Sequence, residues 1–122
     1  MNAMAEPLTP GLPTIELRSA DGAEHFDTVR ELFLEYAALL AVDLCFQGFD
    51  EELATLPGEY APPLGALLLA YVDGQPAGCA ALRPLLDVDY ANACEMKRLY
   101  VRRAFRRFGI GRQLAQALMD HA

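Results

Sequence analysis

The segment from residue 95 to residue 114 carries the residue types best suited to chemistry, in the order EMKRLYVRRAFRRFGIGRQL. Gly109 and Gly111 follow a run of arginines and open a stretch with helical spacing. A glycine lets the backbone approach a ligand closely, because it has no Cβ atom. The first turn of a helix adds N–H groups without intrahelical partners and the positive end of the helix dipole. The spacing therefore predicts a cradle for an anion such as a pyrophosphate.

Two familiar phosphate-binding patterns do not match this segment. A Walker loop needs Gly-Lys-Ser/Thr, whereas Arg112 and Gln113 follow Gly111 here. A dinucleotide-binding turn needs a third glycine where this chain has Leu114. A lone Gly-x-Gly also suits a plain turn between a strand and a helix, so the two glycines alone leave both interpretations open.

The net charge of −7 is unevenly distributed along the chain. Residues 1–96 contain three basic and sixteen acidic side chains, whereas residues 97–122 contain seven basic side chains and one acidic one. An acidic protein with one basic segment is expected to have one local anionic target. The acidic remainder argues against nucleic-acid binding, which stays a remote alternative through residues 97–112 and would bring a steep salt dependence.

Length and composition indicate one globular domain of 122 residues, 53% hydrophobic and 22% charged. The longest apolar stretch, residues 64–72, is too short to cross a bilayer, so no membrane association is expected. We expect residues 1–13 to be a flexible lead-in and residues 14–122 to form the domain. The three cysteines form no Cys-x-x-Cys pair. Free thiols in the cytoplasm and no metal site are therefore expected.

The first half of the chain predicts one strand and two helices. Residues 14–18 alternate apolar and polar side chains, which is typical of a strand. A helix is expected from Glu24, with Asp21 as its cap. Its apolar residues recur at spacings of three and four, and these are Phe26, Val29, Phe33, Tyr36, Ala37 and Leu40. A shorter helix is expected over residues 50–56, and the stretch 42–47 is ambiguous.

The second half predicts a hairpin, a strand and a final helix. Apolar runs at 66–72 and 77–82 flank Asp73-Gly74-Gln75-Pro76, and Asp-Gly suits the positive φ angles of a tight turn. A further strand is expected over 93–101, and a helix from about Ile110. The expected buried face of that helix consists of Ile110, Leu114, Ala117, Leu118 and His121.

The glycine segment as a whole resembles motif A of the GNAT superfamily of acyl-CoA-dependent N-acyltransferases. That motif ends a strand in Leu-x-Val and places Arg/Gln-x-x-Gly-x-Gly/Ala before a helix, as residues 99–101 and 106–111 do here. The order of the preceding elements matches too, so the resemblance spans residues 14–122. It implies an α/β fold of the α+β type, in which helices flank a mixed, mostly antiparallel sheet. Arg103, where the family often has Pro, and Phe108 depart from the pattern.

The resemblance implies an N-acetyltransferase that moves an acetyl group directly from acetyl-CoA to a primary amine. Backbone N–H groups of residues 107–112 would hold the CoA pyrophosphate, with added charge from Arg106 and Arg112. Main-chain groups of Leu99 and Val101 would pair with the pantetheine arm. The expected CoA-binding residues are Leu99, Tyr100, Val101, Arg106, Arg107, Phe108, Gly109, Ile110, Gly111 and Arg112.

Glu95 occupies a position that in the family sometimes acts as the general base on the acceptor amine. An ammonium must lose its proton before it attacks a thioester, so a nearby carboxylate suits the chemistry. The alternative is a structural carboxylate paired with Lys97 or with an arginine. Glu95 precedes Val101 by six residues, so both side chains share a face in a regular strand, and a bulge would change this parity.

The resemblance also places the amine acceptor near the first two helices and their connection. Polar and acidic residues there could attract a cationic amine, and these are Asp43, Gln47, Asp50, Glu51 and Glu52. In the family, further strands and a helix follow the helix after motif A. We therefore expect the C-terminal half of the fold to be absent, with no assignable acid for the leaving thiolate.

An incomplete sheet would have further consequences. We expect self-association through the exposed edge of the 93–101 strand and exposure of Leu114 or Leu118. A non-catalytic CoA-binding or self-associating module remains the alternative function.

Overall fold

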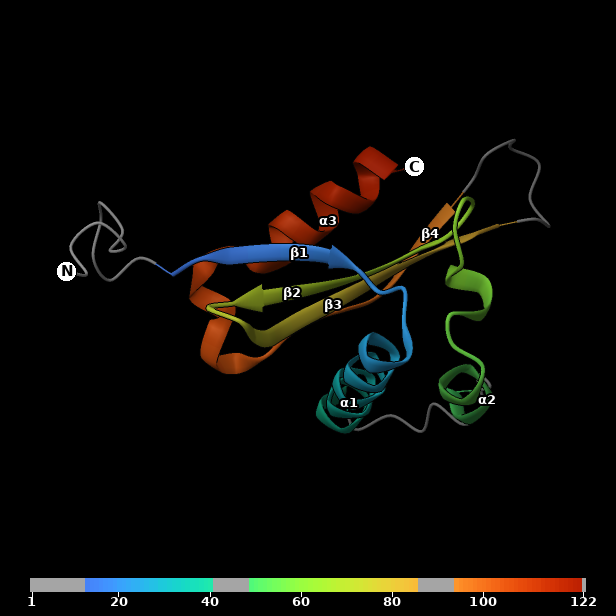
Figure 1. Cartoon of the computed structure of the whole chain (residues 1–122), viewed down its shortest axis with the longest axis horizontal. Coiled ribbons are helices and arrows are strands. Elements are labelled where there is room, and N and C mark those ends of the chain that lie inside the picture. The colour runs from blue at the N-terminus through green and yellow to red at the C-terminus, as the bar shows by residue number, and fades with distance from the viewer. Residues whose placement is uncertain (1–12, 41–48, 86–93, 122) are drawn as a thin grey trace.

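The computed structural model describes residues 13–40, 49–85 and 94–121. The predicted lead-in, apart from Pro13, and the ambiguous stretch 42–47 lie outside these ranges. The elements follow one another as β1 (Ile15–Ser19), α1 (Ala23–Leu40), α2 (Phe49–Ala54), the 3₁₀ helix η3 (Gly58–Tyr60), β2 (Ala66–Val72), β3 (Gln75–Pro84), β4 (Cys94–Val101), the 3₁₀ helix η4 (Arg103–Phe108) and α3 (Ile110–His121) (Figure 1).

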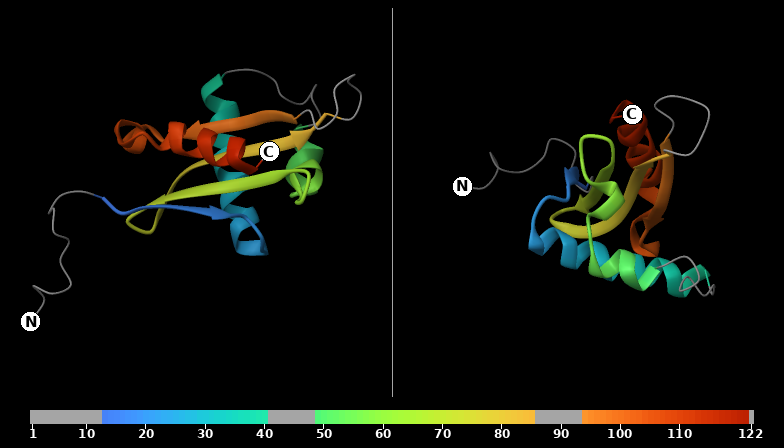
Figure 2. Two further views of the ribbon diagram at one scale, coloured as in Figure 1. Left: turned by 90° about the horizontal axis from the view of Figure 1, so that it is seen from above. Right: turned by 90° about the vertical axis from the view of Figure 1, so that its right-hand side faces the viewer.

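The four strands form one antiparallel sheet in the order β1-β2-β3-β4. α1 and α2 lie on one face of this sheet, and α3 lies on the other, as the views in Figures 1 and 2 agree. The expected α+β class is confirmed. None of the helices among the described residues is both long and apolar enough to span a membrane.

Each face of the sheet has its own hydrophobic core. On the α1 side, Val29, Leu32 and Phe33 pack with residues of α2, η3 and the sheet. On the other side, Ile110, Leu114 and Leu118 of α3 are fully buried. The expectation that Leu114 or Leu118 would be exposed is therefore wrong. Leu114 and Leu118 both point toward the sheet and pack on the small side chains of β2 and β3, because their spacing of four places them on the inner face of the helix.

The β2–β3 hairpin forms as predicted and turns through two residues. Asp73 and Gly74 both have positive φ, 50° and 84°, as a tight hairpin turn requires. The Asp73 N–H donates to the carbonyl of Thr14, and the Thr14 N–H donates to Asp73 Oδ1, each at a distance of 2.9 Å. The turn is thereby tied to the start of β1. β3 begins at Gln75, two residues earlier than expected.

The two helices of the first half differ from expectation in detail. α1 buries Leu32, whereas Leu40 is 45% exposed, so its buried face is centred nearer the first half of the helix. Asp21 pairs with the ring of His25 at 3.1 Å, in place of the expected capping role. α2 ends at Ala54, before Pro57, and the short η3 that follows was not predicted.

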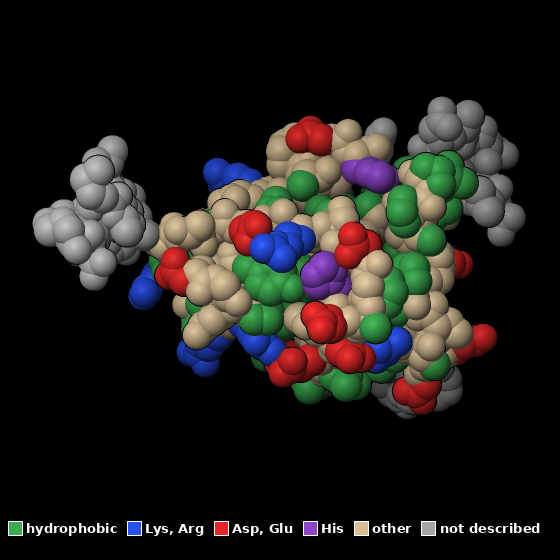
Figure 3. All heavy atoms as spheres, in the orientation of Figure 1, with side chains coloured by type: hydrophobic (Ala, Val, Ile, Leu, Met, Phe, Trp, Pro, Cys, Tyr) green, Lys and Arg blue, Asp and Glu red, His purple; other side chains and the backbone are tan. Residues whose placement is uncertain are grey.

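Basic and acidic side chains are unevenly distributed on one face of the molecule (Figure 3). On the face shown in Figure 3, Lys and Arg side chains gather toward the end where η4 and the start of α3 lie, whereas Asp and Glu side chains gather over α1 and α2. On this face, the basic side chains thus lie mainly near the predicted anion-binding turn.

Candidate functional site

The predicted glycine turn joins β4 to α3 through η4. Gly109 ends η4 in the left-handed conformation with φ 71°, and α3 begins at Ile110. The Gln113 N–H donates to the carbonyl of Gly109 at 3.2 Å, which is the first hydrogen bond of α3. The N–H groups of residues 110–112 precede that bond and so have no acceptor within the helix. A 12-residue helix thus starts beside a basic 3₁₀ turn, which is the arrangement that favours an anion.

The two glycines serve different purposes. Gly109 adopts a φ that favours glycine, although a Cβ there would meet no atom within 4 Å. At Gly111 a Cβ would lie 3.8 Å from Val101 Cγ2, an ordinary contact, so the protein itself tolerates a side chain there. Gly109 therefore shapes the turn, whereas Gly111 lets the start of α3 lie beside the end of β4 at Val101 without a side chain between them.

The arginines of this segment make unequal contacts. Arg106 Nε donates to the Val101 carbonyl at 2.8 Å and folds over the end of β4. The Arg107 guanidinium lies 5.1 Å from the centre of the Phe108 ring, and Arg112 is exposed. Phe108 packs against the core under α3, and Ile110 is fully buried in it. For Ile110, only the main chain is therefore available to a ligand, whereas the Phe108 ring is partly exposed.

β4 forms an edge of the sheet in the part of the chain that the structure describes. Met96 and Leu99 are 36% and 39% exposed along it, and Tyr100 packs toward α1 while Val101 packs toward α3. Residues 95–99 and Tyr36 line a hollow of about 370 Å³ on this strand. The open edge is suited to main-chain pairing with an extended ligand.

A bulge interrupts β4 between Lys97 and Tyr100. Ala81 pairs with Lys97 and Cys79 pairs with Tyr100, so two steps on β3 match three on β4. Arg98, at this irregularity, has a φ of 59°. The extra residue reverses the alternation of side chains along the strand. The regular-strand parity between Glu95 and Val101 is therefore lost.

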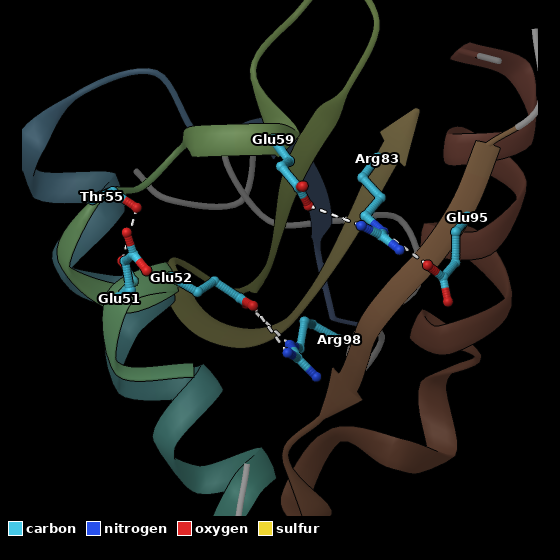
Figure 4. A network of polar contacts seen from close by, with 7 residues as sticks. All are labelled: Glu51, Glu52, Thr55, Glu59, Arg83, Glu95 and Arg98. Atoms are coloured by element: carbon cyan, nitrogen blue, oxygen red, sulfur yellow. Dashed lines mark hydrogen bonds and ion pairs between the residues drawn. The ribbon is translucent and has the colours of Figure 1, made fainter. Parts of the chain in front are cut away.

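Glu95 belongs to an ion-pair chain, shown in Figure 4, that crosses from β4 to η3. Arg83 on β3 donates from Nε to Glu95 Oε1 at 2.8 Å and from Nη1 to Glu59 Oε2 at 3.1 Å. The hydrogen bond from Arg83 lowers the pKa of Glu95, and Glu95 and Glu59 raise that of Arg83. The predicted alternative, pairing with an arginine, is thus present, and the partner is Arg83.

A second ion pair joins α2 to the bulge. Arg98 donates from Nε and Nη2 to the two carboxylate oxygens of Glu52 at 3.0 and 2.9 Å, with side-chain exposures of 4% and 16% (Figure 4). Its guanidinium also lies 5.4 Å from the centre of the Phe49 ring. The hydrogen bonds to Glu52 raise the pKa of Arg98 despite burial. This fork fixes α2 against the irregular part of β4.

A cavity of about 380 Å³ opens between these two ion pairs. Residues of α2, η3, β3 and β4 line it, among them Glu51, Glu59, Arg83 and Lys97. Of the residues predicted to face an amine acceptor, Glu51 and Glu52 line this cavity, and Asp50 lies on the same helix.

The other two predicted acceptor residues, Asp43 and Gln47, lie outside the described residues. Lys97 also lines the hollow on β4, so one side chain borders both cavities.

Sequence reasoning missed a further cluster beside the glycine turn. Arg102 forks onto Glu35 of α1, with Nε–Oε1 2.9 Å and Nη2–Oε2 2.6 Å. The Tyr100 hydroxyl donates to the same Glu35 at 3.1 Å. The sequence contained a signal for this cluster. Glu31 and Glu35 lie one helical turn apart and have no basic residue three or four positions away, which indicates a cationic partner on another element.

Comparisons with known proteins agree with this architecture. Residues 26–122 match the model of the acetyltransferase (GNAT) family. An uncharacterized N-acetyltransferase of Schizosaccharomyces pombe is 35% identical over 100 residues, 81% of this chain and 60% of that protein. One of Dictyostelium discoideum is 41% identical over 70 residues, 57% of this chain and 32% of that protein. The chain thus spans less than two thirds of the length of these relatives.

Solved structures share the fold at low sequence identity. A GNAT-family acetyltransferase from Staphylococcus aureus superposes with a TM-score of 0.70 at 18% identity, covering 88% of this chain and 65% of that chain. An aminoglycoside N-acetyltransferase in complex with CoA gives a TM-score of 0.65 at 20% identity, over 93% and 72% of the two chains. The family match over residues 26–122, together with this fold, shows that the chain belongs to the GNAT acetyltransferase family.

Proposed function

We propose that this protein transfers an acetyl group from acetyl-CoA directly to a primary amine. The turn from β4 through η4 and Gly109 into α3 carries the proposal, because it presents free N–H groups and arginines at one point. The backbone of residues 107–112 would bind the pyrophosphate of CoA, with charge from Arg106 and Arg112. The main chain of residues 99–101, on the edge strand, would pair with the pantetheine arm.

The reaction needs a neutral amine beside the thioester. The amine nitrogen attacks the acetyl carbonyl carbon, the new C–N bond forms and the C–S bond breaks. The nitrogen, now bonded to the acetyl group, loses its second proton to water, and the CoA thiolate takes a proton back from water, so that no net proton or hydroxide is left from this step. The proton that the ammonium loses would go to Glu95 directly or through water. Arg83 keeps the pKa of Glu95 low, so Glu95 is ionised at neutral pH and able to accept, although it is a weaker base for the same reason.

The acceptor amine would enter through the cavity between α2, η3 and the strands. Glu51 and Glu59 line that cavity, and carboxylates attract an ammonium group. Glu59 shares Arg83 with Glu95, which would place the acceptor side of the site next to the proposed base. Lys97 borders this cavity and the hollow on β4, where the thioester would lie.

A non-catalytic CoA-binding or self-associating module is the second candidate. It is favoured by the open edge of β4 in the described sheet. CoA binding without turnover would identify it.

Calorimetric titration with CoA, followed by assay of thiol release from acetyl-CoA against a panel of amines, tests the proposal. The panel should include amino acids, amino sugars, polyamines and peptide N-termini. We expect CoA to bind and at least one amine to be acetylated. Absence of CoA binding by the folded protein would overturn the proposed function.

A further inference from the structure

We infer that Arg102, held by Glu35, is a positioning residue that sets the CoA-binding turn against α1. The inference rests on the proposed CoA site and adds to it two residues outside the expected binding set. Arg102 follows the last residue of β4 directly and occupies the N-cap position of η4, where its carbonyl accepts from the Phe105 N–H at 2.9 Å. Its placement therefore decides where the turn begins.

The guanidinium of Arg102 contacts two other elements of the fold, α1 and β3. Besides the fork to Glu35, Nη1 donates to the Pro76 carbonyl at 3.1 Å and Nη2 lies 3.2 Å from Glu31 Oε1. The Arg102 backbone N–H donates to the Ala77 carbonyl at 2.7 Å. One residue therefore joins α1, the start of β3 and the start of η4.

Glu35 completes the arrangement from the α1 side. Its Oε1 accepts from both Arg102 and the Tyr100 hydroxyl, so it holds two of the residues that flank Val101. The neighbouring Tyr36 ring meets the Tyr100 ring edge-on, with 6.1 Å between centroids. One turn of α1 thus fixes the end of β4 where the main chain would meet pantetheine.

These contacts distinguish Arg102 from Arg106 and Arg112, which are proposed to bind the CoA phosphates. Its Nε, Nη1 and Nη2 each have a protein acceptor, and its side chain is 25% exposed. Arg103, the next residue, is exposed. Arg102 is thus expected to act through the backbone of the turn and not through direct contact with CoA.

A lysine at position 102 would keep the positive charge and lose the fork. An ammonium is a point charge on a flexible stem and cannot make two parallel hydrogen bonds to one carboxylate while also bonding Pro76. Arg102→Lys therefore removes the geometry without changing the net charge. Arg103→Lys is the matched control, because it makes the same chemical change one residue away.

The test measures the Kd for CoA in the two variants, well below the melting temperature of each. We expect Arg102→Lys to raise Kd about tenfold and Arg103→Lys to change it less than about twofold. The salt dependence of Kd should have the wild-type slope in Arg102→Lys, because no phosphate-neutralising charge is lost. A purely structural ion pair would lower the melting temperature and leave the Kd of the folded protein unchanged.

Glu35→Gln and Tyr100→Phe keep the inference testable if Arg102→Lys does not fold. Glu35→Gln should also raise the Kd for CoA. Tyr100→Phe should raise it less, because it removes only one hydrogen bond. A wild-type Kd in folded Glu35→Gln would overturn the positioning role and leave the CoA site intact. Failure of the wild-type protein to bind CoA would overturn the proposed function together with this inference.

Discussion

Glu95 and Val101 lie six residues apart on β4, yet they face opposite sides of the sheet. Glu95 pairs with Arg83 on the α1–α2 side, whereas Val101 packs into the core under α3. The bulge at Arg98 supplies the extra residue that separates them. The proposed base and the acceptor cavity are therefore brought to one face.

Changing Glu95 to Gln tests the proposed base. Once an amine that the protein acetylates has been identified, we expect Glu95→Gln to keep the CoA affinity and to lower the acetylation rate by about 10²–10⁴-fold. The loss should shrink at high pH, where the amine is already neutral.

Glu16→Gln is the control, since it removes an arginine-paired carboxylate on β1 that does not line the proposed acceptor cavity. A wild-type rate for Glu95→Gln at neutral pH would leave Glu95 as a structural partner of Arg83.

The two glycines of the turn should respond differently to substitution. Gly111→Val should keep the helical content and abolish CoA binding. A Cβ there is at ordinary contact distance from Val101, and the added methyl groups would crowd the backbone that is proposed to meet the pyrophosphate. Gly109→Val should also abolish binding, through strain at a positive φ.

Gly109→Asn should retain part of the affinity, since Asn tolerates the left-handed conformation. Calorimetry with CoA and circular dichroism measure the two effects. Normal affinity in both valine variants would exclude this site.

Removing Arg98 should destabilise the protein. Arg98→Met leaves Glu52 without its buried partner, and breaking a buried pair costs about 3 kcal/mol or more in the free energy of unfolding. Arg18→Met is the control, because Arg18 and Glu16 form an exposed pair and such pairs contribute about 0–1 kcal/mol. Urea denaturation compares the two, and equal losses would contradict a special role for the Glu52–Arg98 fork.

The Glu35–Arg102 pair should make stability depend on acidic pH. The hydrogen bond from Arg102 lowers the pKa of Glu35 in the folded protein. A carboxyl group whose pKa is lower in the folded than in the unfolded protein stabilises the folded state. That stabilisation is complete above the pKa of the unfolded state, about 4.3 for Glu, and is lost as the pH falls through the pKa of the folded state. The stability difference between wild type and Glu35→Gln should thus be constant from neutral pH to about 5.5 and shrink below. Thermal unfolding across pH measures this, and a constant difference down to pH 3 would contradict it.

The 122-residue chain should self-associate through β4. Met96 and Leu99 are exposed on this edge of the described sheet, and unpaired strand edges attract other strands. Met96→Lys should reduce association, because a charged side chain on an edge strand opposes strand pairing. Analytical ultracentrifugation over a concentration series decides this, and a wild-type monomer throughout would contradict the prediction.

Local patterns in the sequence were enough for most of the elements. The Asp73-Gly74 turn and the β2 strand follow from residue types, because positive φ angles and apolar runs depend on near neighbours. The glycine turn after Val101 was predicted for the same reason, since a strand end, two glycines and a helical spacing lie within one short segment.

Tertiary structure decided the contacts that join distant segments. Arg83 pairs with Glu95 and Glu59, and Arg102 with Glu35, across 12, 24 and 67 residues respectively, and the sequence contains several other possible partners for each arginine. The bulge at Arg98 likewise depends on the register of β3 against β4, which no local signal specifies. Residue types determine which charges are available, whereas the packing of α1 and α2 on the sheet selects which of them meet, because only folding brings them within hydrogen-bonding distance.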